Sequence, residues 1–335
     1  MNENNLFGWL LDSLPGPDLD AQRKVADRAG QVLRPLGALA RLDQIAVWLA
    51  GWQRTDHPRV EHPVVVVFAA DHGVTEEGVS AYPVETTATM VRVFRHGLGT
   101  VNVLAAEVGA KVGVVDVGVG VPTANLAVED ALSPQRFAAC VAAGQKAVAD
   151  ANNPDLLVVG EMGIGNTTAA AAVAAALFGG PVEGWVGRGT GIDDDALSRK
   201  TQAVRRALAR IGAISDPFEA LRRVGGAELA AAAGALVEAR IRSIPVLLDG
   251  FVVTAAAAPL ELAKAGSLAH CLAGHRSAEP GHDLLLAELG LEPLLDLDLR
   301  LGEGSGAVAA IPLVRMAVRA VTDVPTFAEW DLAAR

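Results

Sequence analysis

The run VVVVFAA at residues 64–70, followed directly by Asp71, decides the fold class of this chain. A short stretch of β-branched and apolar residues without polar alternation is typical of a strand buried on both faces of a parallel sheet. Similar runs recur at residues 112–117, 156–160 and 244–248. Alanine-rich segments of helical character, such as 167–178 and 228–240, separate them. Strands that alternate with helices predict an α/β fold with a parallel sheet flanked by helices.

Each of these four runs has a carboxylate at or near its C-terminal end: Asp71, Asp116, Glu161 and Asp249. The carboxyl ends of parallel strands meet at one edge of the sheet, where ligands bind in open α/β folds. Four acids at this edge, with His72 beside the first, therefore predict an active site there. For Asp71 or Asp249 taken singly, a helix N-cap is an equally good interpretation.

The two ends of the chain have a different pattern from the middle. Residues 18–53 are mostly helical, with a break at 35–37, and residues 312–335 return to helix. This change is the only indication of a domain boundary, because we find no internal repeat and no low-complexity linker.

Charge and composition exclude several classes of protein. The 335 residues include 28 Lys and Arg against 39 Asp and Glu, a formal net charge of −11. This balance argues against a nucleic-acid-binding protein and against a basic membrane anchor. Two cysteines, Cys140 and Cys271, cannot build a disulfide framework or a four-thiolate metal site. The N-terminus does not resemble a signal peptide, and the longest apolar run, residues 169–178, is too short to span a membrane. We therefore expect a cytoplasmic protein.

Two glycine-rich turns predict an anion site. The first, GEMGIGNTT at residues 160–168, joins a strand to an alanine-rich helix, and the second, GRGTG at 187–191, precedes a helix that carries Lys200. Glycines allow a ligand to approach the backbone closely, and free N–H groups at a helix start favour an anion. Together with Lys200, the turns form a plausible cradle for one phosphate. The alternative is that Asn166 or Thr167 merely caps the helix.

A third glycine-rich turn, RLGEGSG at residues 300–306, contains Glu303. A carboxylate in an apolar stretch loses hydration, which raises its pKa toward the range of a general base. The alternative is a solvated glutamate in an ordinary turn. Ser305 does not lie in the G-x-S-x-G pattern of a serine hydrolase, and no histidine pattern indicates a metal site.

At this point several motifs combine. They are ADHGV at 70–74 with the following EGVSAYP at 77–83, GEMGIGNTT at 160–168, VGRGTGIDDD at 186–195, LDGFVVTAAA at 248–257, GHRSAEPGH at 274–282 and LRLGEGSGA at 299–307. Over roughly residues 34–330 the sequence resembles the nicotinate-nucleotide–dimethylbenzimidazole phosphoribosyltransferases, which act in lower-ligand assembly of cobalamin.

The resemblance implies a Rossmann-like parallel sheet with helices on both faces, plus a small helical domain built from both chain termini. The small domain would comprise residues 1–55 and 307–335. Residues 56–306 would form the α/β catalytic domain, with its active site at the C-terminal ends of the strands. The resemblance also implies a homodimer that needs no cofactor and no metal. The reaction that the resemblance implies is transfer of phosphoribose from nicotinate mononucleotide to 5,6-dimethylbenzimidazole, giving α-ribazole 5′-phosphate and nicotinate.

The resemblance also assigns roles to individual residues. Glu303 falls at the position of the catalytic base, Glu161 at the second active-site carboxylate and Lys200 at the active-site lysine. The residues placed at the acceptor base are Ser80, Tyr82, Met90 and Met162, of which we expect the Tyr82 ring to be buried. Those placed at the phosphoribosyl group are Gly163, Gly165, Asn166, Thr167, Arg188, Gly189, Thr190 and Gly191; Asp71, His72 and Asp249 are further site candidates. Departures from the family pattern at Ala38, Ala40, Thr89 and residues 96–100 leave the acceptor range open.

There are four alternatives to this reaction. The same chemistry could serve another aromatic acceptor, such as adenine, a different benzimidazole or a phenol. A protein that binds a nucleotide or an α-riboside without chemistry is a second alternative, although it would not require Glu303, Glu161 and Lys200. An NAD-dependent oxidoreductase is disfavoured, because Asp-His-Gly-Val, not G-x-G-x-x-G, follows the first strand. No acidic pair with a TGGT-like turn indicates a pyrophosphate donor.

For the transfer that the resemblance implies, the donor has a β-glycosidic bond and the product is α. A single in-line displacement with inversion at C1′ is therefore the simplest mechanism.

Overall fold

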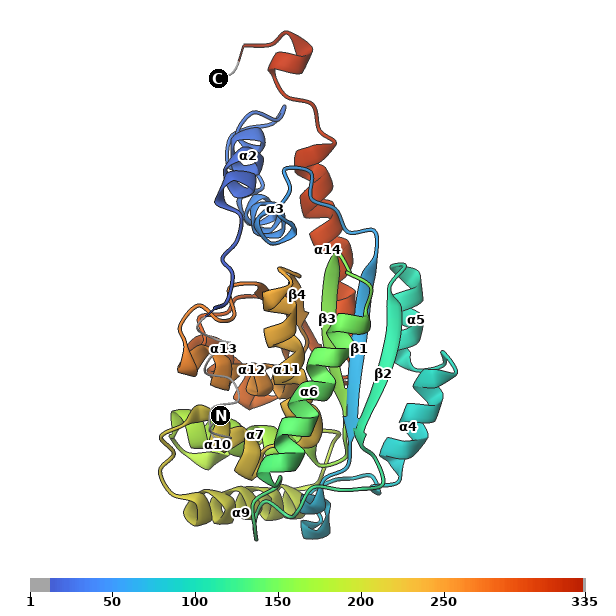
Figure 1. Cartoon of the computed structure of the whole chain (residues 1–335), viewed down its shortest axis with the longest axis vertical. Coiled ribbons are helices and arrows are strands. Elements are labelled where there is room, and N and C mark those ends of the chain that lie inside the picture. The colour runs from blue at the N-terminus through green and yellow to red at the C-terminus, as the bar shows by residue number, and fades with distance from the viewer. Residues whose placement is uncertain (1–12, 334–335) are drawn as a thin grey trace.

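The computed structural model describes residues 13–333, so the predictions for residues 1–12, 334 and 335 lie outside the described residues. Six parallel strands form one sheet in the order β2-β1-β3-β4-β5-β6 (Figure 1). Their bounds are β1 Pro63–Ala70, β2 Lys111–Gly118, β3 Leu156–Met162, β4 Val246–Leu248, β5 Cys271–Ser277 and β6 Pro293–Leu299. β2 lies on one side of β1, and the strands that follow in the sequence lie on the other side. This change in the order of the strands creates a crevice between the carboxyl ends of β1 and β3.

Helices cover both faces of the sheet. The bounds are α2 Leu19–Ala29, α3 Ala40–Gln53, α4 Thr86–Arg95, α5 Thr100–Glu107, α6 Pro134–Asp150, α7 Asn166–Phe178, α8 Val182–Trp185, α9 Asp194–Ile211, α10 Pro217–Val224, α11 Ala227–Ile241, α12 Phe251–Ala263, α13 Pro280–Glu288 and α14 Ser305–Thr322, with 3₁₀ turns η1 Gly73–Glu77 and η2 Ala328–Trp330. The predicted α/β fold with a parallel sheet flanked by helices is confirmed.

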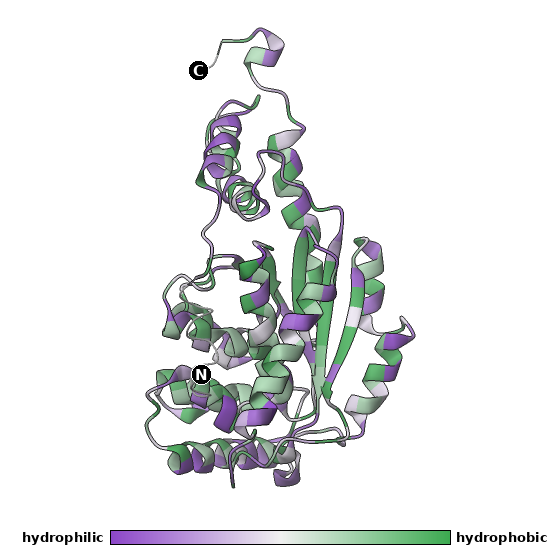
Figure 2. Cartoon of the chain, viewed as in Figure 1, coloured by the Kyte–Doolittle hydropathy of each residue, from purple (hydrophilic) through white to green (hydrophobic). Residues whose placement is uncertain are grey.

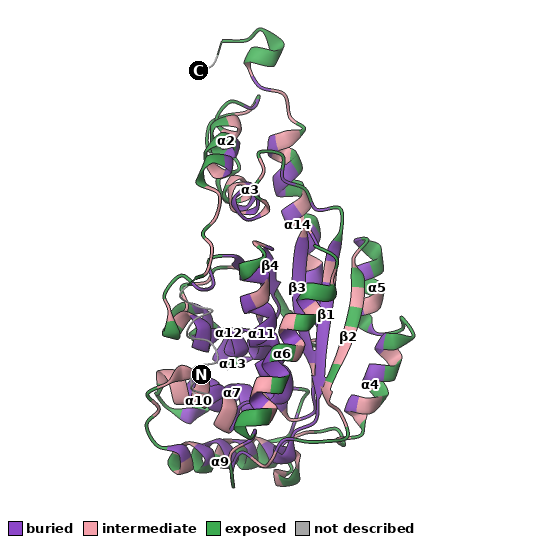
Figure 3. Ribbon diagram, in the orientation of Figure 1, coloured by how far each residue is buried: buried purple, intermediate pink, exposed green. Residues whose placement is uncertain are grey.

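The first strand explains why its sequence is apolar throughout. Val66, Phe68 and Ala70 pack into a core that α6, α7, α11 and α12 cover. Val65 and Val67 point the other way, into a second core under α5 and α14. Side chains alternate between the faces of a strand, so a strand between two helical layers needs apolar residues at every position. Figures 2 and 3 show this centre as hydrophobic and buried.

Two strands were not anticipated from the sequence, and several boundaries differ. β5 (CLAGHRS) and β6 (PLLDLDL) carry polar residues, so neither has the apolar run that identified the others. β3 extends to Met162, which places Glu161 inside the strand, and Asp116 likewise lies inside β2. β4 begins at Val246 and not at residue 244. Near the C-terminus, the expected helix at 326–330 is reduced to the short η2.

Helices α2 and α3 meet the end of α14 at the amino-terminal edge of the sheet, opposite the carboxyl ends of the strands (Figure 1). Val25 of α2, Ala46 and Ala50 of α3 and Val321 of α14 form a small apolar cluster. Arg28 donates hydrogen bonds to the carbonyls of Val321, Thr322 and Val324 at the end of α14. The helix α14 crosses residue 307 without interruption, and the division into two domains stays a prediction.

Helix α14 is long and apolar enough to cross a membrane by length and composition, the only such helix among residues 13–333. In this structure it is a core helix, because Val308, Ile311 and Val314 are buried against the sheet.

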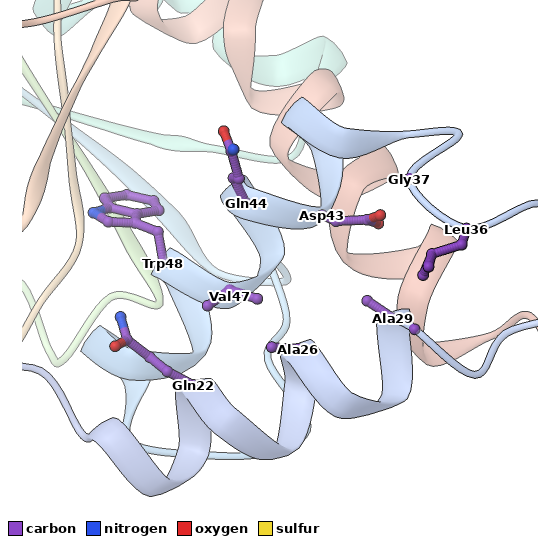
Figure 4. A pocket seen from close by; sticks show the side chains of 10 residues that line it. Gln22, Ala26, Ala29, Leu36, Gly37, Asp43, Gln44, Val47 and Trp48 are labelled. Carbon is purple, nitrogen blue, oxygen red and sulfur yellow. The ribbon is translucent and has the colours of Figure 1, made fainter.

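A groove between α2 and α3 lies at the amino-terminal edge of the sheet (Figure 4). Its lining includes Ala26, Val47 and Trp48, together with Asp43, which pairs with Arg34. The groove is therefore remote from the acids at the carboxyl edge.

Helices α6 and α11 approach each other backbone to backbone. A Cβ atom on Gly234 would overlap the carbonyl of Val141, and one on Gly144 would overlap the carbonyl of Ala231. Overpacking of a close-packed interior costs about 1–3 kcal/mol. We expect Gly234→Ala to lower the free energy of unfolding by about 2 kcal/mol, measured by urea denaturation. Gly16→Ala is the control, since a Cβ there meets no atom within 4 Å; equal midpoints for the two variants would contradict the expectation.

Candidate active site

A cleft opens at the carboxyl end of the sheet between the two glycine-rich turns predicted to bind an anion. Asn166, Thr167, Gly189 and Thr190 are common to two adjoining hollows. One hollow extends toward Glu161 and Gly302, and the other toward Ser80 and Lys200. The structure therefore brings the three glycine-rich turns together around one site.

Lys200 on α9 joins the first two turns. Its ammonium donates to Thr167 Oγ1 at 2.8 Å and to the carbonyl of Gly187 at 2.9 Å. Only 1% of the residue is exposed. Burial lowers the pKa of Lys200 to about 8, an effect that the nearby carboxylate of Glu279 opposes. A buried ammonium beside the N-terminus of α7 makes this part of the cleft suitable for an anion.

The helix-cap alternative for Asn166 and Thr167 is wrong. The N-cap of α7 is Gly165, and no side chain caps this helix. Instead, the amide of Asn166 donates to the carboxylate of Glu161, and the hydroxyl of Thr167 accepts from Lys200. Both side chains therefore connect the phosphate cradle to the ionisable groups of the cleft.

Glu303 lies in a backbone conformation that requires support. Gly302, Glu303 and Gly304 all have positive φ, at 82°, 65° and 88°. The left-handed region is unfavourable for a residue with a side chain, and such residues cluster at functional sites. The carboxyl of Glu303 is buried, and its Oε2 has no hydrogen-bond partner among residues 13–333. Burial raises the pKa of Glu303 to about 7, against the backbone N–H of Val101, which lowers it, and together with Asp249, which raises it.

Asp249 holds this turn in place. Its carboxylate accepts a hydrogen bond from the N–H of Gly304 at 3.1 Å and another from the N–H of Ala307 at 3.0 Å. Both donors belong to the start of α14, whose first N–H groups have no partner within the helix. Asp249 therefore does not cap the helix that follows it; Gly250 occupies that position. It instead connects the end of β4 to the turn that carries Glu303.

Glu161 lies directly beside that turn. The backbone N–H of Glu303 donates to the carbonyl of Glu161 at 3.2 Å. A Cβ on Gly302 would lie 2.5 Å from Glu161 Oε1, so glycine is required there for space as well as for conformation. Burial raises the pKa of Glu161 to about 8, and the charges of Asp249, Glu228 and Glu303 act in the same direction. Glu161 is thus mainly protonated at neutral pH.

Asp71, His72 and Asp116 do not enter the cleft. Asp71 accepts from the N–H of Gly120 at 2.7 Å and so holds the loop after β2. His72 is fully buried, with its Nε2 2.6 Å from Glu228 Oε1, behind the first glycine-rich turn. Asp116 accepts from the N–H groups of Gly118 and Val119 in its own loop. Of the four strand-end acids, Glu161 lines the cleft and Asp249 supports the turn that carries Glu303, whereas Asp71 and Asp116 bind loops outside the cleft.

The residues expected at the acceptor base are divided. Ser80 and Met162 line the cleft, one in each hollow. Met90 and Met162 both pack against the core under α14. Tyr82 is 53% exposed, so the expectation of a buried ring is wrong. Tyr82 lies in a surface loop before α4, where its backbone N–H donates to Ser80 Oγ.

The remaining phosphoribosyl candidates belong to the first and second turns, and their role stays a prediction. Gly163, Gly165, Arg188 and Gly189 line the hollow that contains Lys200. Arg188 donates to the carbonyl of Ile192 and so also stabilises the turn. Gly191 lines an adjoining hollow on the outer side of the turn, together with Arg300.

Sequence reasoning missed four polar side chains in the cleft: His275, Ser277, Glu279 and Arg300. His275 and Ser277 lie in β5, and Glu279 comes two residues after it; the apolar pattern did not reveal this strand. Arg300 donates to the carbonyl of Gly189 at 3.1 Å and thereby links the third turn to the second. The motif at residues 274–282 was the available signal, although it indicated no particular role. No group of three or more potential metal-ligating His, Cys, Asp or Glu side chains occurs within residues 13–333.

Known proteins provide the context for this site. A family model described as Phosphoribosyltransferase matches residues 14–331. The chain belongs, within that class, to the nicotinate-nucleotide–dimethylbenzimidazole phosphoribosyltransferase family. A protein of that name from Cereibacter sphaeroides is 48% identical over 98% of this chain and 96% of its own length. Another from Ruegeria pomeroyi is 49% identical over 96% of this chain and 95% of its own. The crystal structure of CobT from Thermus thermophilus superimposes with a TM-score of 0.90 and 44% identity, covering 94% of this chain and all of that one.

The raised pKa of Glu161 has a consequence for stability. A carboxyl whose folded pKa is about 8 holds a proton that the unfolded chain releases near its ordinary value of 4.5, so stability falls as pH rises between these values. We expect Glu161→Gln to raise the melting temperature by about 2 °C or more at pH 9, and by less at pH 5. Glu288→Gln, at an exposed position on α13, is the matched control and is expected to change nothing. A Glu161→Gln effect of equal size at both pH values would show that burial of the charge is not its cause.

Proposed function

We propose that this chain transfers the phosphoribosyl group of nicotinate mononucleotide to 5,6-dimethylbenzimidazole, releasing nicotinate and forming α-ribazole 5′-phosphate. The observation that carries the proposal is the buried, unpaired carboxylate oxygen of Glu303, held beside the same cleft as the cationic cradle of Lys200. The names of the relatives support the choice of donor and acceptor.

In this proposal the donor phosphate binds in the cradle. The backbone around Gly163, Gly165, Asn166 and Thr167 supplies the positive end of α7, and Lys200 supplies a charge. The second turn, with Arg188, Gly189, Thr190 and Gly191, closes over the phosphate from the other side. Anchoring the phosphate fixes the ribose, so that C1′ points toward Glu303 and Glu161.

The acceptor lies on the Glu161 side of the cleft in this proposal. Met162 lines that side, and a thioether is a favourable neighbour for an aromatic ring. Ser80, Met90 and the exposed Tyr82 stay predictions as base-contacting residues.

The reaction is a single displacement with inversion. One ring nitrogen of the acceptor attacks C1′ and forms the new C–N bond, while its other nitrogen gives its proton to Glu303. The bond from C1′ to nicotinate breaks with its electron pair on the pyridine nitrogen, so the leaving group needs no proton. The positioned carboxylate accelerates the step by removing charge as it develops on the acceptor. Glu161, protonated at neutral pH, acts as the second carboxyl and avoids placing another charge beside the base.

We also propose that the protein acts as a homodimer in the cytoplasm and binds neither membrane nor nucleic acid. The family resemblance supports the dimer, and the net charge of −11 supports the lack of affinity for a phosphate backbone. The reaction as written requires no cofactor and no metal. Other aromatic acceptors with an acidic N–H or O–H fit the same chemistry.

The first test is nicotinate release from nicotinate mononucleotide, with and without dimethylbenzimidazole. We expect release to depend on the acceptor. Glu303→Ala is expected to reduce the rate by about 10²–10⁴-fold, the usual contribution of a positioned base. Glu288→Gln should behave as wild type, because this residue is exposed on α13. If wild type binds the mononucleotide yet releases nicotinate with none of a panel of benzimidazoles, purines and phenols, the protein is a binding protein and not a transferase.

The pH dependence tests the role of Glu303 separately. A base is active in its deprotonated form, and burial raises the pKa of Glu303 to about 7. Activity should therefore be lost as pH falls through about 7, which kcat/KM for the acceptor reports for the enzyme with donor bound. The residual activity of Glu303→Gln should lack this acid limb. An identical limb in the variant would assign the titration to the acceptor itself.

A further inference from the structure

One wall of the cleft has no role in the reaction as written. It comes from the end of β5 and the start of α13, where His275, Ser277 and Glu279 line the hollow that Glu161 also lines. The backbone N–H of Glu279 donates to Ser277 Oγ, which fixes this corner of the chain. The backbone of Glu279 is thus fixed at the N-cap of α13.

Glu279 has a carboxylate oxygen without a hydrogen-bond partner. Only 7% of the residue is exposed, and its buried Oε2 accepts no hydrogen bond within residues 13–333. Glu303 also has an unpaired Oε2, whereas three other buried acids of this region each have a hydrogen-bond partner. Asp249 accepts two N–H groups, Glu228 pairs with His72, and Glu161 accepts from Asn166. A buried polar group left unpaired is costly, so this carboxylate is prepared for donors that come from outside the protein.

The position of Glu279 indicates which part of a ligand supplies those donors. Lys200 donates to the carbonyl of Gly187, and the carboxylate of Glu279 lies so close to Gly187 that a Cβ there would overlap it. Lys200 and Glu279 therefore both contact Gly187, which places Glu279 next to the cationic cradle. It also lines the hollow that contains Glu161 and Gly302. A group that contacts Glu279 lies between the phosphate site and the reacting carbon.

The chemistry of the contact follows from charge. A carboxylate repels a phosphate or another carboxylate and accepts hydrogen bonds from neutral hydroxyls. In the phosphoribosyl group, the only hydroxyls between the phosphate and C1′ are those at C2′ and C3′. Acidic side chains serve the same purpose on the ribose of dinucleotides.

We propose that Glu279 accepts hydrogen bonds from the ribose hydroxyls of the donor and makes the enzyme selective for ribose over deoxyribose. This inference rests on the proposed function. Through this contact the sugar is held at a third point besides the phosphate and the reaction centre, and C1′ is thereby oriented toward the acceptor.

The first test uses the wild-type enzyme with three donors: nicotinate mononucleotide and its 2′-deoxy and 3′-deoxy analogues. A site built to bond a hydroxyl strongly rejects an analogue that lacks it. We expect kcat/KM to fall at least tenfold for one of the deoxy donors. If both are used as well as the parent, the proposal is wrong, whatever any variant does.

The second test removes the carboxylate. We expect Glu279→Ala to lower kcat/KM for the parent donor by about 10–100-fold, and Glu279→Gln to lie between Ala and wild type. With the deoxy donor that wild type rejects, the variants and wild type should differ by less than about threefold. Glu183→Gln is the matched control, because Glu183 lies exposed on the adjacent α8 and pairs with Arg205.

The possible outcomes are distinct. An equal loss with all three donors would mean that Glu279 acts through Lys200 and not through a hydroxyl, and would overturn the proposal. Melting temperatures of the variants identify a loss of folding, in which case the wild-type donor series decides alone. Absence of turnover of the parent donor by wild type would instead contradict the proposed function itself.

Discussion

The pair of hydrogen bonds from the backbone of α14 to Asp249 is the interaction on which the catalytic edge depends. Three consecutive residues in the left-handed region form a turn that a free chain avoids. Asp249 makes this conformation stable, because its carboxylate satisfies two buried N–H groups that the helix itself leaves unpaired. The position of Glu303 relative to β3 follows directly. The negative charge of Asp249 has a second effect, since it raises the pKa of both Glu303 and Glu161.

The electrostatic character of the cleft results from exclusion of water. Burial raises the pKa of two glutamates and lowers that of Lys200, so all three change protonation within about one pH unit of each other, close to neutrality. The charged forms of these side chains are less stable in the buried cleft than they would be on the protein surface. A ligand that brings a phosphate to the ammonium and hydroxyls to a carboxylate relieves part of this cost. Binding therefore stabilises the folded state by mass action as well as by contact.

The sequence predicted the elements whose pattern is simple. β1, β3 and β4 were visible because strands between two helical layers contain almost nothing but apolar residues. The edge strand β2 is partly exposed and was visible through its valine-rich run. The glycine turns were visible because they follow such strands. β5 and β6 were not, because β6 is a partly exposed edge strand and β5 contains His275 and Arg276 among its seven residues. Because β5 was not predicted, the sequence provided no reason to place Glu279 in the cleft.

Roles of single side chains were harder to predict than the location of the site. A carboxylate at a strand end can line the cleft, as Glu161 does, or bind a neighbouring loop, as Asp71 does. The local sequence is similar in both cases, and the difference depends on contacts with distant residues. His72 illustrates the same limit, because its partner Glu228 lies 156 positions away. The exposure of Tyr82 likewise depends on how the loop before α4 packs.

Helix α14 has a mechanical consequence that follows from its two ends. Its first turn carries the backbone bonds to Asp249, and its last turn receives the guanidinium of Arg28 from α2. Eighteen residues make a rod of about 27 Å between these points. An α-helix transmits a displacement along its axis with little compression. A displacement of α2 and α3 would therefore reach the turn that carries Glu303, at the opposite edge of the molecule.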